Sequence, residues 1–480
     1  MRTFWIRHWK LLTVLAVVFY IIIGMLAPFA VQKSIDKGEN SFHKEDFYAE
    51  GQGERSVDRA HVVEENMEAL EQRIRMAEAA EERIILSTFD FREDESTWDY
   101  AAALYHAAER GVQIKILVDG VSGLLRMEGH PFFYALSSHP EIEIRLYNIP
   151  NPIKPWTVNG RMHDKYVICD DQTLLLGGRN TFSYFIGDYD TDGRSYDREV
   201  LIYNTDSANG AEKSVISQVE TYFQSIWNGD ATRQFHEEEN LQKKEKVQES
   251  IRKLEERYRT LKEKYPQCFE PYFYEAHTVP IKKASLLSGE TGIYGKKPVV
   301  WDTLRQLMAS ADQKVVLHTP YAVLDSQMEE GMKEIAERVE DFSMVLNSVE
   351  NGDNVVASSD YLIHKKDILE TGVQVYEFDG GDSSHGKSIL IDDDLAVIGS
   401  YNLDMRSTYM DTELMLVVHG EEFAAELADY MDVFQERCRK VLDEEHYEVP
   451  PNVSVREIPW MKKVIFAVLG PLLQPVRYLA

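Results

Sequence analysis

One twenty-residue pattern occurs twice in this 480-residue chain, and it constrains the fold more than any other feature. The first copy reads RMHDKYVICDDQTLLLGGRN and the second reads SSHGKSILIDDDLAVIGSYN. In both copies a lysine follows the histidine by two positions, an aspartate by seven and an asparagine by seventeen. These residues are His163, Lys165, Asp170 and Asn180 in the first copy, and His385, Lys387, Asp392 and Asn402 in the second. The two copies lie 222 positions apart, and a repeat of more than 150 residues is far longer than the ~20–50 residues of a solenoid unit, so it predicts a duplicated domain.

The spacing within each copy predicts a β-hairpin. Histidine and lysine two positions apart on a strand project from the same face. Asp170–Gln172 and Asp392–Asp394 place turn-forming residues between two apolar runs. Asn180 and Asn402 then follow the returning strand, where they can lie beside the histidines. We therefore expect two imidazoles, two ammonium groups and two amides to meet in one site.

This set of side chains suits phosphoryl-group transfer without a metal ion. One imidazole can attack phosphorus, the other can protonate the leaving group, and lysines and amides can stabilise the phosphate oxygens. A zinc site would need cysteine or carboxylate ligands at ligand spacing, and a lysine beside each histidine disfavours a divalent cation. A single HxK sequence is more often structural, but two copies with matched offsets predict a functional site. We expect neither a metal ion nor another cofactor.

Both copies lie in similar sequence surroundings. Short apolar runs rich in β-branched residues alternate with helical stretches, as in α/β proteins. The runs are 84–89, 112–118 and 142–147 before the first motif, and 315–319, 344–348 and 373–378 before the second. We predict an α/β fold with two similar halves, each a β-sheet flanked by helices, with one shared active site between them. The halves are placed at residues 61–235 and 276–450.

Two polar segments complete this middle part of the chain. Residues 32–60 are polar and aperiodic, which predicts a linker. Residues 236–275 form a charged helical connector whose single apolar stripe is expected to lie against the body. The stripe consists of Val247, Ile251, Leu254, Tyr258 and Leu261.

Composition excludes several classes of protein. The formal net charge of −29 argues against a nucleic-acid partner, because lysine and arginine supply most of the affinity for phosphates. The 44% hydrophobic content argues against a disordered polyanion. Three widely separated cysteines exclude a disulfide framework and a CxxC zinc site.

Both ends of the chain suggest contact with a bilayer. Residues 11–31 carry no charge and follow a basic flank, and a membrane span needs ~20 such residues. We expect an uncleaved, single-pass anchor at residues 1–31 in the cell membrane, with the N-terminus in the cytoplasm and the catalytic domain outside. Residues 451–480 form an amphipathic tail whose apolar run, 464–473, is too short to span. That tail predicts either a segment lying in the headgroup plane or a terminal helix packed on the fold.

The two HxKxxxxD motifs, with GGRN at 177–180 and GSYNLDMRS at 399–407, resemble the phospholipase D superfamily. Within it, the chain resembles the bacterial cardiolipin synthases with one N-terminal hydrophobic segment. LNS at 346–348 and YLIHKKDILETGVQVYE at 361–377 resemble the same class. The resemblance spans about residues 60–450 and implies two α/β halves with the active site between them.

The resemblance also implies roles for the motif residues. One histidine would form a phosphohistidine, while the other would protonate the leaving alcohol and then deprotonate the acceptor. It implies His163 as the nucleophile and His385 as the acid and base, with the reverse order left open. The groups that would hold the phosphate oxygens are Lys165, Lys387, Asn180 and Asn402.

Further carboxylates and a hydroxyl follow from the same resemblance. Glu413 matches the carboxylate that holds the second histidine, and either Asp197 or Glu199 would be its counterpart in the first half. Ser400 matches a substrate-contacting hydroxyl, whereas Gly178 takes its place in the first half. The motif aspartates, Asp170 and Asp392, are expected to support turns and sheets and not to react.

One segment also matches a calcium-binding pattern. Residues 188–199, DYDTDGRSYDRE, satisfy the EF-hand loop, with ligands at Asp188, Asp190, Asp192 and Glu199. Ser195 stands where that loop usually carries an apolar residue, and the flanking sequences do not predict two helices. We therefore favour an acidic surface loop.

These patterns favour a membrane-anchored phosphatidyltransferase of the cardiolipin-synthase type. Its substrate would be phosphatidylglycerol, with phosphatidylethanolamine as a second candidate, and its partner the lipid bilayer. The alternative is a phospholipase D that hydrolyses phospholipids to phosphatidic acid. A nuclease of the same superfamily is disfavoured by the charge, and a non-catalytic lipid-binding protein by the two intact motifs.

Overall fold

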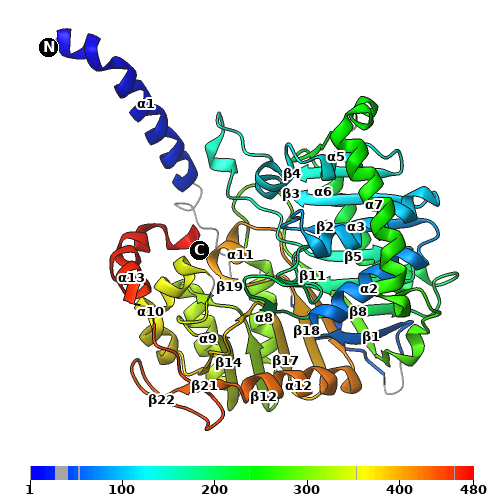
Figure 1. Cartoon of the computed structure of the whole chain (residues 1–480). Coiled ribbons are helices and arrows are strands. Elements are labelled where there is room, and N and C mark those ends of the chain that lie inside the picture. Colours follow the sequence, from blue (N-terminus) through cyan, green and yellow to red (C-terminus); the bar gives the residue numbers. More distant parts are fainter. Residues whose placement is uncertain are drawn as a thin grey trace.

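The computed structural model describes residues 2–27, 42–51, 55–236, 238–352, 354–458 and 460–479. Two nine-stranded mixed sheets form its framework, one in each half (Figure 1). The first has the order β10-β1-β8-β6-β5-β2-β3-β4-β9 and the second β11-β20-β18-β17-β12-β14-β15-β21-β22. From β8 to β4 and from β20 to β15, the two orders follow the same path, so the described part of the chain contains a duplicated domain.

The strands of the first sheet are β1 (Asp58–Val63), β2 (Arg83–Thr88), β3 (Gln113–Asp119), β4 (Ile142–Tyr147), β5 (Tyr166–Cys169), β6 (Thr173–Gly177), β8 (Glu199–Asn204), β9 (Thr232–Gln234) and β10 (Val279–Pro280). Those of the second are β11 (Lys283–Ser288), β12 (Lys314–His318), β14 (Asp341–Asn347), β15 (Gln374–Phe378), β17 (Ser388–Ile391), β18 (Leu395–Gly399), β20 (Leu414–His419), β21 (Cys438–Val441) and β22 (Tyr447–Glu448). Two-stranded pairs join β13 (Ala322–Val323) to β19 (Leu403–Asp404), and β7 (Ser195–Tyr196) to β16 (Ser383–Ser384).

Helices cover the sheets in layers. The outer layer of the first half consists of α2 (Asn66–Ala79), α3 (Glu95–Glu109), α5 (Pro131–Ser137) and α7 (Glu245–Lys264). The outer layer of the second half consists of α8 (Val299–Ala309), α9 (Ser326–Arg338) and α10 (Val355–Glu370). Between the sheets, α6 (Val215–Trp227) and α12 (Glu421–Gln435) complete one apolar core shared by both halves. This shared core fixes the halves relative to each other.

The predicted strands and hairpins are confirmed. The six apolar runs form β2, β3, β4, β12, β14 and β15, and the two motifs continue into the hairpins β5–β6 and β17–β18. The histidines and lysines differ from the prediction in one respect, because they lie in the extended segment just before each first strand. The first sheet also begins earlier than predicted, since β1 starts at Asp58, inside the expected linker. Residues 32–41 and 52–54 of that linker lie outside the described residues, whereas residues 42–51 include the short helix η2 (Lys44–Asp46) and bury Phe47 against the second half.

The connector helix α7 packs its apolar stripe on the first half. Val247, Leu254, Tyr258 and Leu261 are buried, and Ile251 is partly buried against the same core. The stripe contacts α3 and α5. The charged faces of this helix therefore point to solvent, as its composition requires.

The N-terminal helix requires a correction. Helix α1 (Arg2–Leu26) projects from the body (Figure 1). Among the described residues, we find no helix with the length and apolar character needed to cross a membrane. Residues 1 and 28–31 of the predicted anchor lie outside the described residues. The predicted transmembrane anchor at residues 1–31 is therefore not supported.

The C-terminal tail packs on the fold. Helix α13 (Trp460–Leu473) lies against α10 and buries Phe466. The following turn, η9 (Gln474–Leu479), is fixed by Arg477, which donates to both carboxylate oxygens of Asp360 at 2.8 and 2.9 Å. The alternative of a packed terminal helix is thus observed, although part of α13 stays exposed.

Candidate active site

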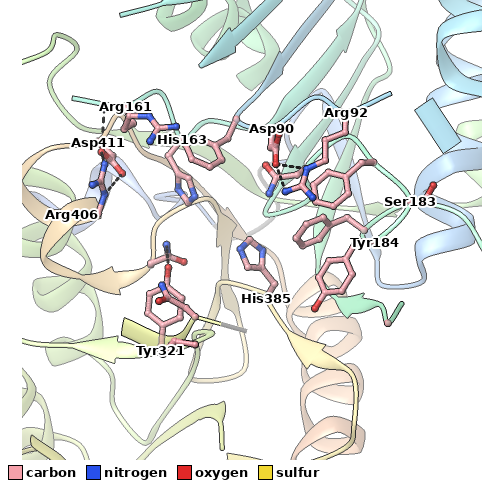
Figure 2. Close-up of a pocket in the computed structure, with 18 of the residues that line it drawn as sticks. Asp90, Arg92, Arg161, His163, Ser183, Tyr184, Tyr321, His385, Arg406 and Asp411 are labelled. Carbon is pink, nitrogen blue, oxygen red and sulfur yellow. Dashed lines mark hydrogen bonds and ion pairs between the residues drawn. The ribbon is translucent and has the colours of Figure 1, made fainter. Parts of the chain in front are cut away.

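A cleft of about 880 Å³ lies between the two halves and receives both motif histidines (Figure 2). His163 comes from the first half and His385 from the second, and both line the cleft. Asn180 and Asn402 line it as well. The structure therefore brings both copies of the repeated pattern to one place.

Short parallel strand contacts between the halves set the position of each histidine. Met162 forms a parallel bridge with Thr412, and the backbone nitrogen of His163 lies 3.3 Å from the Thr412 carbonyl oxygen. In the same way, β16 pairs with β7, and the backbone nitrogen of His385 donates to Tyr196 at 2.7 Å. His163 therefore lies beside the residue after Thr412, and His385 lies beside the residue after Tyr196. These two residues are Glu413 and Asp197, and both carry a carboxylate.

Each histidine is thus held by a carboxylate of the opposite half. Nδ1 of His163 lies 2.8 Å from Oε1 of Glu413, and Nδ1 of His385 lies 2.7 Å from Oδ2 of Asp197. The prediction that Glu413 holds the second histidine is wrong, because the inter-half strand contacts exchange the partners. Of the two candidates in the first half, Asp197 is the structural counterpart of Glu413. Gly177 pairs with Glu199 on β8, and the matching Gly399 pairs with Met415 on β20, so Asp197 and Glu413 each stand two residues before equivalent positions.

Buried hydroxyls position the Glu413 carboxylate. Ser407 donates to Oε1 at 2.6 Å, and Ser400 donates to Oε2. Ser400, predicted to contact substrate, is fully buried, supports Glu413 and is not among the residues that line the cleft. In the first half, a Cβ at Gly178 would collide with the Asp197 carboxylate. The glycine thus makes room for the aspartate where the second half has a serine beside a glutamate.

The two imidazoles have different electrostatic surroundings. Burial, together with Lys165 and Lys387, holds the pKa of His163 well below its ordinary value. Burial also raises the pKa of Glu413 to about 8. At the other pair, burial opposes ionisation of Asp197, but His385 and Lys387 outweigh it and hold the pKa of this carboxyl below its ordinary value. His163 is therefore favoured as a neutral imidazole, and His385 lies beside a carboxylate that stays ionised.

Each motif lysine donates to the carbonyl oxygen of the histidine two positions before it. Nζ of Lys165 donates to the carbonyl oxygen of His163, and burial lowers the pKa of Lys165 to about 7. Nζ of Lys387 lies 2.8 Å from Nδ1 of His385 and also donates to the His385 carbonyl oxygen. Both residues are 1% exposed and neither is among those that line the cleft, so their charges act on the histidines in a setting of low dielectric.

The asparagine amides and the motif aspartates have different roles. The Oδ1 atoms of Asn180 and Asn402 are buried without a hydrogen-bond partner among the described residues, and Nδ2 of Asn402 donates to the Tyr321 hydroxyl at 3.1 Å. Asp170 accepts three backbone N–H groups, those of residues 81–83, at 2.7 to 3.0 Å. Asp392 does the same for residues 312–314 at 2.8 to 3.0 Å. The two aspartates therefore tie each hairpin to the neighbouring strand, as the sequence predicted.

Glu199 lies outside the site. It is fully buried and accepts two hydrogen bonds from Arg73, at 2.6 and 2.9 Å, so its predicted contacts with His163 and substrate do not form. This pairing also removes the last ligand of the calcium pattern. Asp188 is exposed and lies 3.5 Å from Arg194, so the acidic segment is a surface loop at the edge of the cleft.

Three arginines of the cleft were not predicted. Arg161 and Arg406 face the space beside His163, and Arg92 lies on the opposite side (Figure 2). Asp119 holds Arg161 through three hydrogen bonds, and Asp411 pairs with Arg406 at 3.1 Å. The sequence could have indicated Arg161, because it stands two residues before the first motif histidine. Nothing in the local sequence distinguished Arg92.

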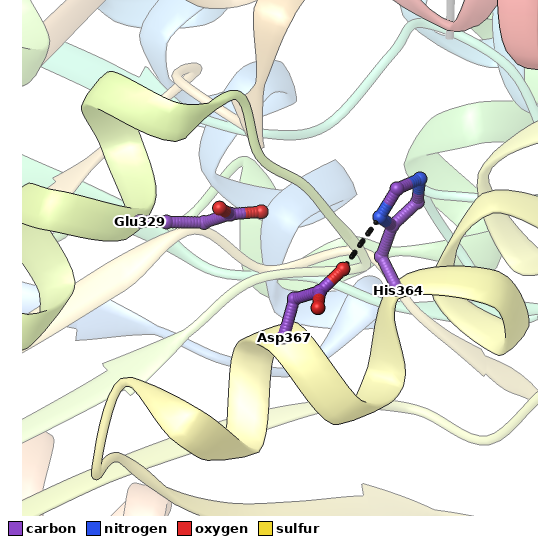
Figure 3. A group of neighbouring side chains, drawn as sticks. All are labelled: Glu329, His364 and Asp367. Atoms are coloured by element: carbon purple, nitrogen blue, oxygen red, sulfur yellow. Dashed lines mark hydrogen bonds and ion pairs between the residues drawn. The ribbon is translucent and has the colours of Figure 1, made fainter.

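One group among the described residues has the composition of a metal site, and it lies outside the cleft. Glu329, His364 and Asp367 come from α9 and α10 (Figure 3). Nδ1 of His364 bonds Asp367 at 2.9 Å, and its Nε2 lies 2.8 Å from Oε1 of Gln474. Both ring nitrogens thus have partners in the packing of the C-terminal tail. The group does not contribute to the histidine pair.

Comparison with known proteins adds a family and a fold. The family described as "Cardiolipin synthase, PLD-like domain" matches residues 73–227 and 304–434, more than half of the chain, with one motif in each segment. Cardiolipin synthase C of Escherichia coli (strain K12) is 25% identical over 404 residues, covering 75% of this chain and 81% of that protein. An uncharacterized protein of Helicobacter pylori (strain ATCC 700392 / 26695) is 24% identical over 400 residues, covering 76% of this chain and 77% of that protein.

A solved structure shares the two-half architecture. Phosphatidylserine synthase of Haemophilus influenzae Rd KW20 superposes with a TM-score of 0.61 at 16% identity. The superposition covers 88% of this chain and 95% of that protein. At this level of identity the likeness is one of fold.

Proposed function

The chain belongs to the cardiolipin synthase, PLD-like domain family of enzymes, and on that premise we propose that it transfers a phosphatidyl group from one phospholipid to another. Phosphatidylglycerol is the proposed acceptor and the first candidate donor, with phosphatidylethanolamine as the second. Cardiolipin and a free headgroup alcohol would be the products. The cleft residues support a two-step reaction through a phosphohistidine.

In the first step, a ring nitrogen of His163 attacks the donor's phosphorus, and the bond from phosphorus to the headgroup oxygen breaks. The leaving oxygen takes a proton from His385. In the second step, His385 accepts the proton of the acceptor's hydroxyl, whose oxygen attacks phosphorus while the phosphorus–nitrogen bond breaks. Lys165, Lys387 and the two asparagine amides would stabilise the phosphate oxygens in both steps.

The unequal surroundings of the two imidazoles carry this assignment. A nucleophile must be neutral, and burial with two neighbouring lysines favours neutral His163. A general acid must hold a proton. The ionised Asp197 carboxylate lies 2.7 Å from Nδ1 of His385 and would stabilise the charge of a protonated ring against the ammonium of Lys387, 2.8 Å from the same nitrogen. The same two steps with water as acceptor would release phosphatidic acid, which is the alternative function.

We also propose that the enzyme works at the cell membrane. Helix α1 exposes apolar side chains along its length, among them Leu11, Val14 and Phe19. Such a surface is unfavourable in water and suits contact with lipid. The location of the catalytic domain outside the cell stays a prediction.

Lipid mass spectrometry on the purified full-length protein tests the function. The protein is incubated with phosphatidylglycerol alone, with phosphatidylethanolamine alone, and with both. Cardiolipin from phosphatidylglycerol alone supports the transferase with this lipid as donor, and cardiolipin only from the mixture names phosphatidylethanolamine as donor. Phosphatidic acid without cardiolipin would replace the transferase by the hydrolase. If neither product forms, the proposal is contradicted.

A further inference from the structure

Exposed apolar side chains occur on four segments around the entrance of the cleft. Leu125 is 70% exposed in η3 (Gly123–Met127), and Ile153 is 76% exposed just before η4 (Pro155–Thr157). Trp460, which opens α13, is 74% exposed, and the outer face of α13 continues with exposed Val464 and Val468. The fourth segment is α1, which also exposes apolar side chains. Monomeric proteins rarely show so much apolar surface in water without a partner for it.

Contacts from each segment lead to the cleft. Ser122, next to η3, donates to the cleft residue Asp90 at 2.7 Å. Leu479, at the end of the tail that follows α13, lines the cleft itself. These two contacts place η3 on the first-half side of the entrance and the C-terminal tail on the second-half side.

The remaining two segments meet at the same place. The hydroxyl of Tyr20 in α1 donates to the carbonyl oxygen of Ile153 at 2.9 Å. Asn159, just beyond η4, donates to the carbonyl oxygen of Met25 at 2.6 Å. The carbonyl oxygen of Asn159 in turn accepts from the cleft residue Arg406 at 3.2 Å. These contacts connect the apolar segments to cleft residues of both halves.

Charge separates these segments from the rest of the molecule. Residues 1–27, 120–127, 149–158 and 460–479 contain eight lysines and arginines and no aspartate or glutamate, in a chain of net charge −29. Arg126, Lys154 and Lys463 are exposed beside the apolar side chains. An apolar surface with basic neighbours is complementary to an anionic lipid headgroup layer, whereas the acidic body would be repelled by it.

We propose that these four segments form one docking face for an anionic phospholipid surface. Leu125, Ile153 and the outer face of α13 would enter the headgroup layer and hold the cleft entrance against the lipid. This proposal rests on the proposed function and deepens it. A docked entrance lets a phospholipid place its phosphate near the histidines while its acyl chains remain in the bilayer.

Site-specific fluorescence on the full-length protein tests the face. The native cysteines, Cys169, Cys268 and Cys438, are all buried, so a new exposed cysteine can be labelled selectively with an environment-sensitive dye. We would label Leu125→Cys, Ile153→Cys and Val464→Cys, with Val433→Cys as a matched control. Val433 is 63% exposed on α12, away from the four segments (Figure 1).

Vesicles of phosphatidylcholine mixed with phosphatidylglycerol should raise and blue-shift the emission at positions 125, 153 and 464, and leave position 433 unchanged. If the emission at positions 125 and 153 is unchanged on vesicles that bind the protein, the proposed docking face is wrong and α1 is the membrane contact. Blue shifts that depend on protein concentration and need no vesicles would assign the surface to self-association and also overturn it.

A charge-insertion pair gives a second measurement. The double variant Leu125→Glu/Ile153→Glu should lose about tenfold or more in affinity for the same vesicles, because two charges would enter the headgroup layer. Val433→Glu should bind as the parent does. Equal vesicle affinity of the double variant and the parent would contradict the proposal.

Activity on a short-chain phosphatidylglycerol that stays monomeric in solution separates the two proposals. The double variant should keep the parent's activity on this lipid, since neither residue touches the cleft. A parent protein that docks on vesicles but converts neither form of the lipid would end the proposed function and leave the docking face standing.

Discussion

His385 takes its hydrogen-bonding carboxylate from Asp197 in the other half of the chain, with 2.7 Å between Nδ1 and Oδ2. Glu413 stands in the same relation to His163 at 2.8 Å. Neither half therefore contains a complete histidine–carboxylate pair. The duplicated sequence yields one site by exchange, and each imidazole depends on the packing between the halves.

Replacement of Asp197 should affect the chemical step and not substrate binding. Asp197→Asn removes the charge that favours protonated His385, so we expect kcat to fall by about 10²–10⁴-fold while KM changes little. Steady-state kinetics on monomeric lipid measures both. Asp192→Asn, at an exposed acid that lines the same cleft, is the control and should stay near the parent's kcat. Equal loss in both variants would contradict a specific role for Asp197.

Trapping the intermediate should identify the nucleophile. His385→Ala lacks the proposed acid, but a phosphatidyl ester of p-nitrophenol needs little protonation of its leaving group. We expect this variant to accumulate a phosphatidyl adduct on the peptide that contains His163, detected by mass spectrometry after digestion. His163→Ala should form none. An adduct on His385 in the His163→Ala protein would reverse the two roles.

The pKa of Glu413 predicts a pH-dependent stability. Because burial raises this pKa from 4.5 to about 8, the folded protein holds a proton that the unfolded chain releases. Stability from this group is present below pH ~4.5 and is lost as the pH rises towards ~8, by at most about 1.4 kcal/mol per pH unit.

Glu413→Gln removes that titration. The free energy of unfolding of the variant, minus that of the parent, should increase from pH 5 to pH 8 and then level off. Urea denaturation at several pH values measures the difference. Parallel curves for the two proteins would show that Glu413 is already ionised in the fold at low pH.

The motif aspartates should contribute to stability and not to turnover. Asp170→Ala leaves three backbone N–H groups without their acceptor and places alanine at a φ of 50°, so we expect a loss of about 1–3 kcal/mol. Asp170→Asn tolerates the left-handed backbone and keeps one oxygen acceptor, so it should lose less. Urea denaturation measures both variants. A loss of kcat per folded molecule in Asp170→Asn would indicate a direct role in the reaction.

The sequence predicted the elements that follow from local pattern. The hairpins β5–β6 and β17–β18 combine apolar strands with a turn at Asp170 or Asp392, and both aspartates adopt the positive φ that such turns need. The gathering of both histidines and both asparagines at one cleft followed from the matched offsets. The hairpins depend on residues close together in the sequence, and the meeting of the two motifs was inferred from their repetition.

The partners of the histidines could not be predicted in the same way. Offsets were measured within one half, whereas the strand contacts β7–β16 and Met162–Thr412 join residues about 190 to 250 positions apart. Each involves only one or two residues per strand, which leaves no periodic signal. Glu199 was misplaced because its burial with Arg73 depends on how α2 packs on β8.

The β10 strand has a consequence for how the chain tolerates cleavage. It follows the exposed stretch around Phe273 and Glu275, yet it completes the sheet of the first half by pairing with β1. A protease cut in that stretch would leave a C-terminal fragment still bound through β10, the exchanged carboxylates and the shared core. The nicked enzyme should elute as a single particle under native conditions and separate only in denaturant, so the two halves could be produced as a split protein that works after reassociation.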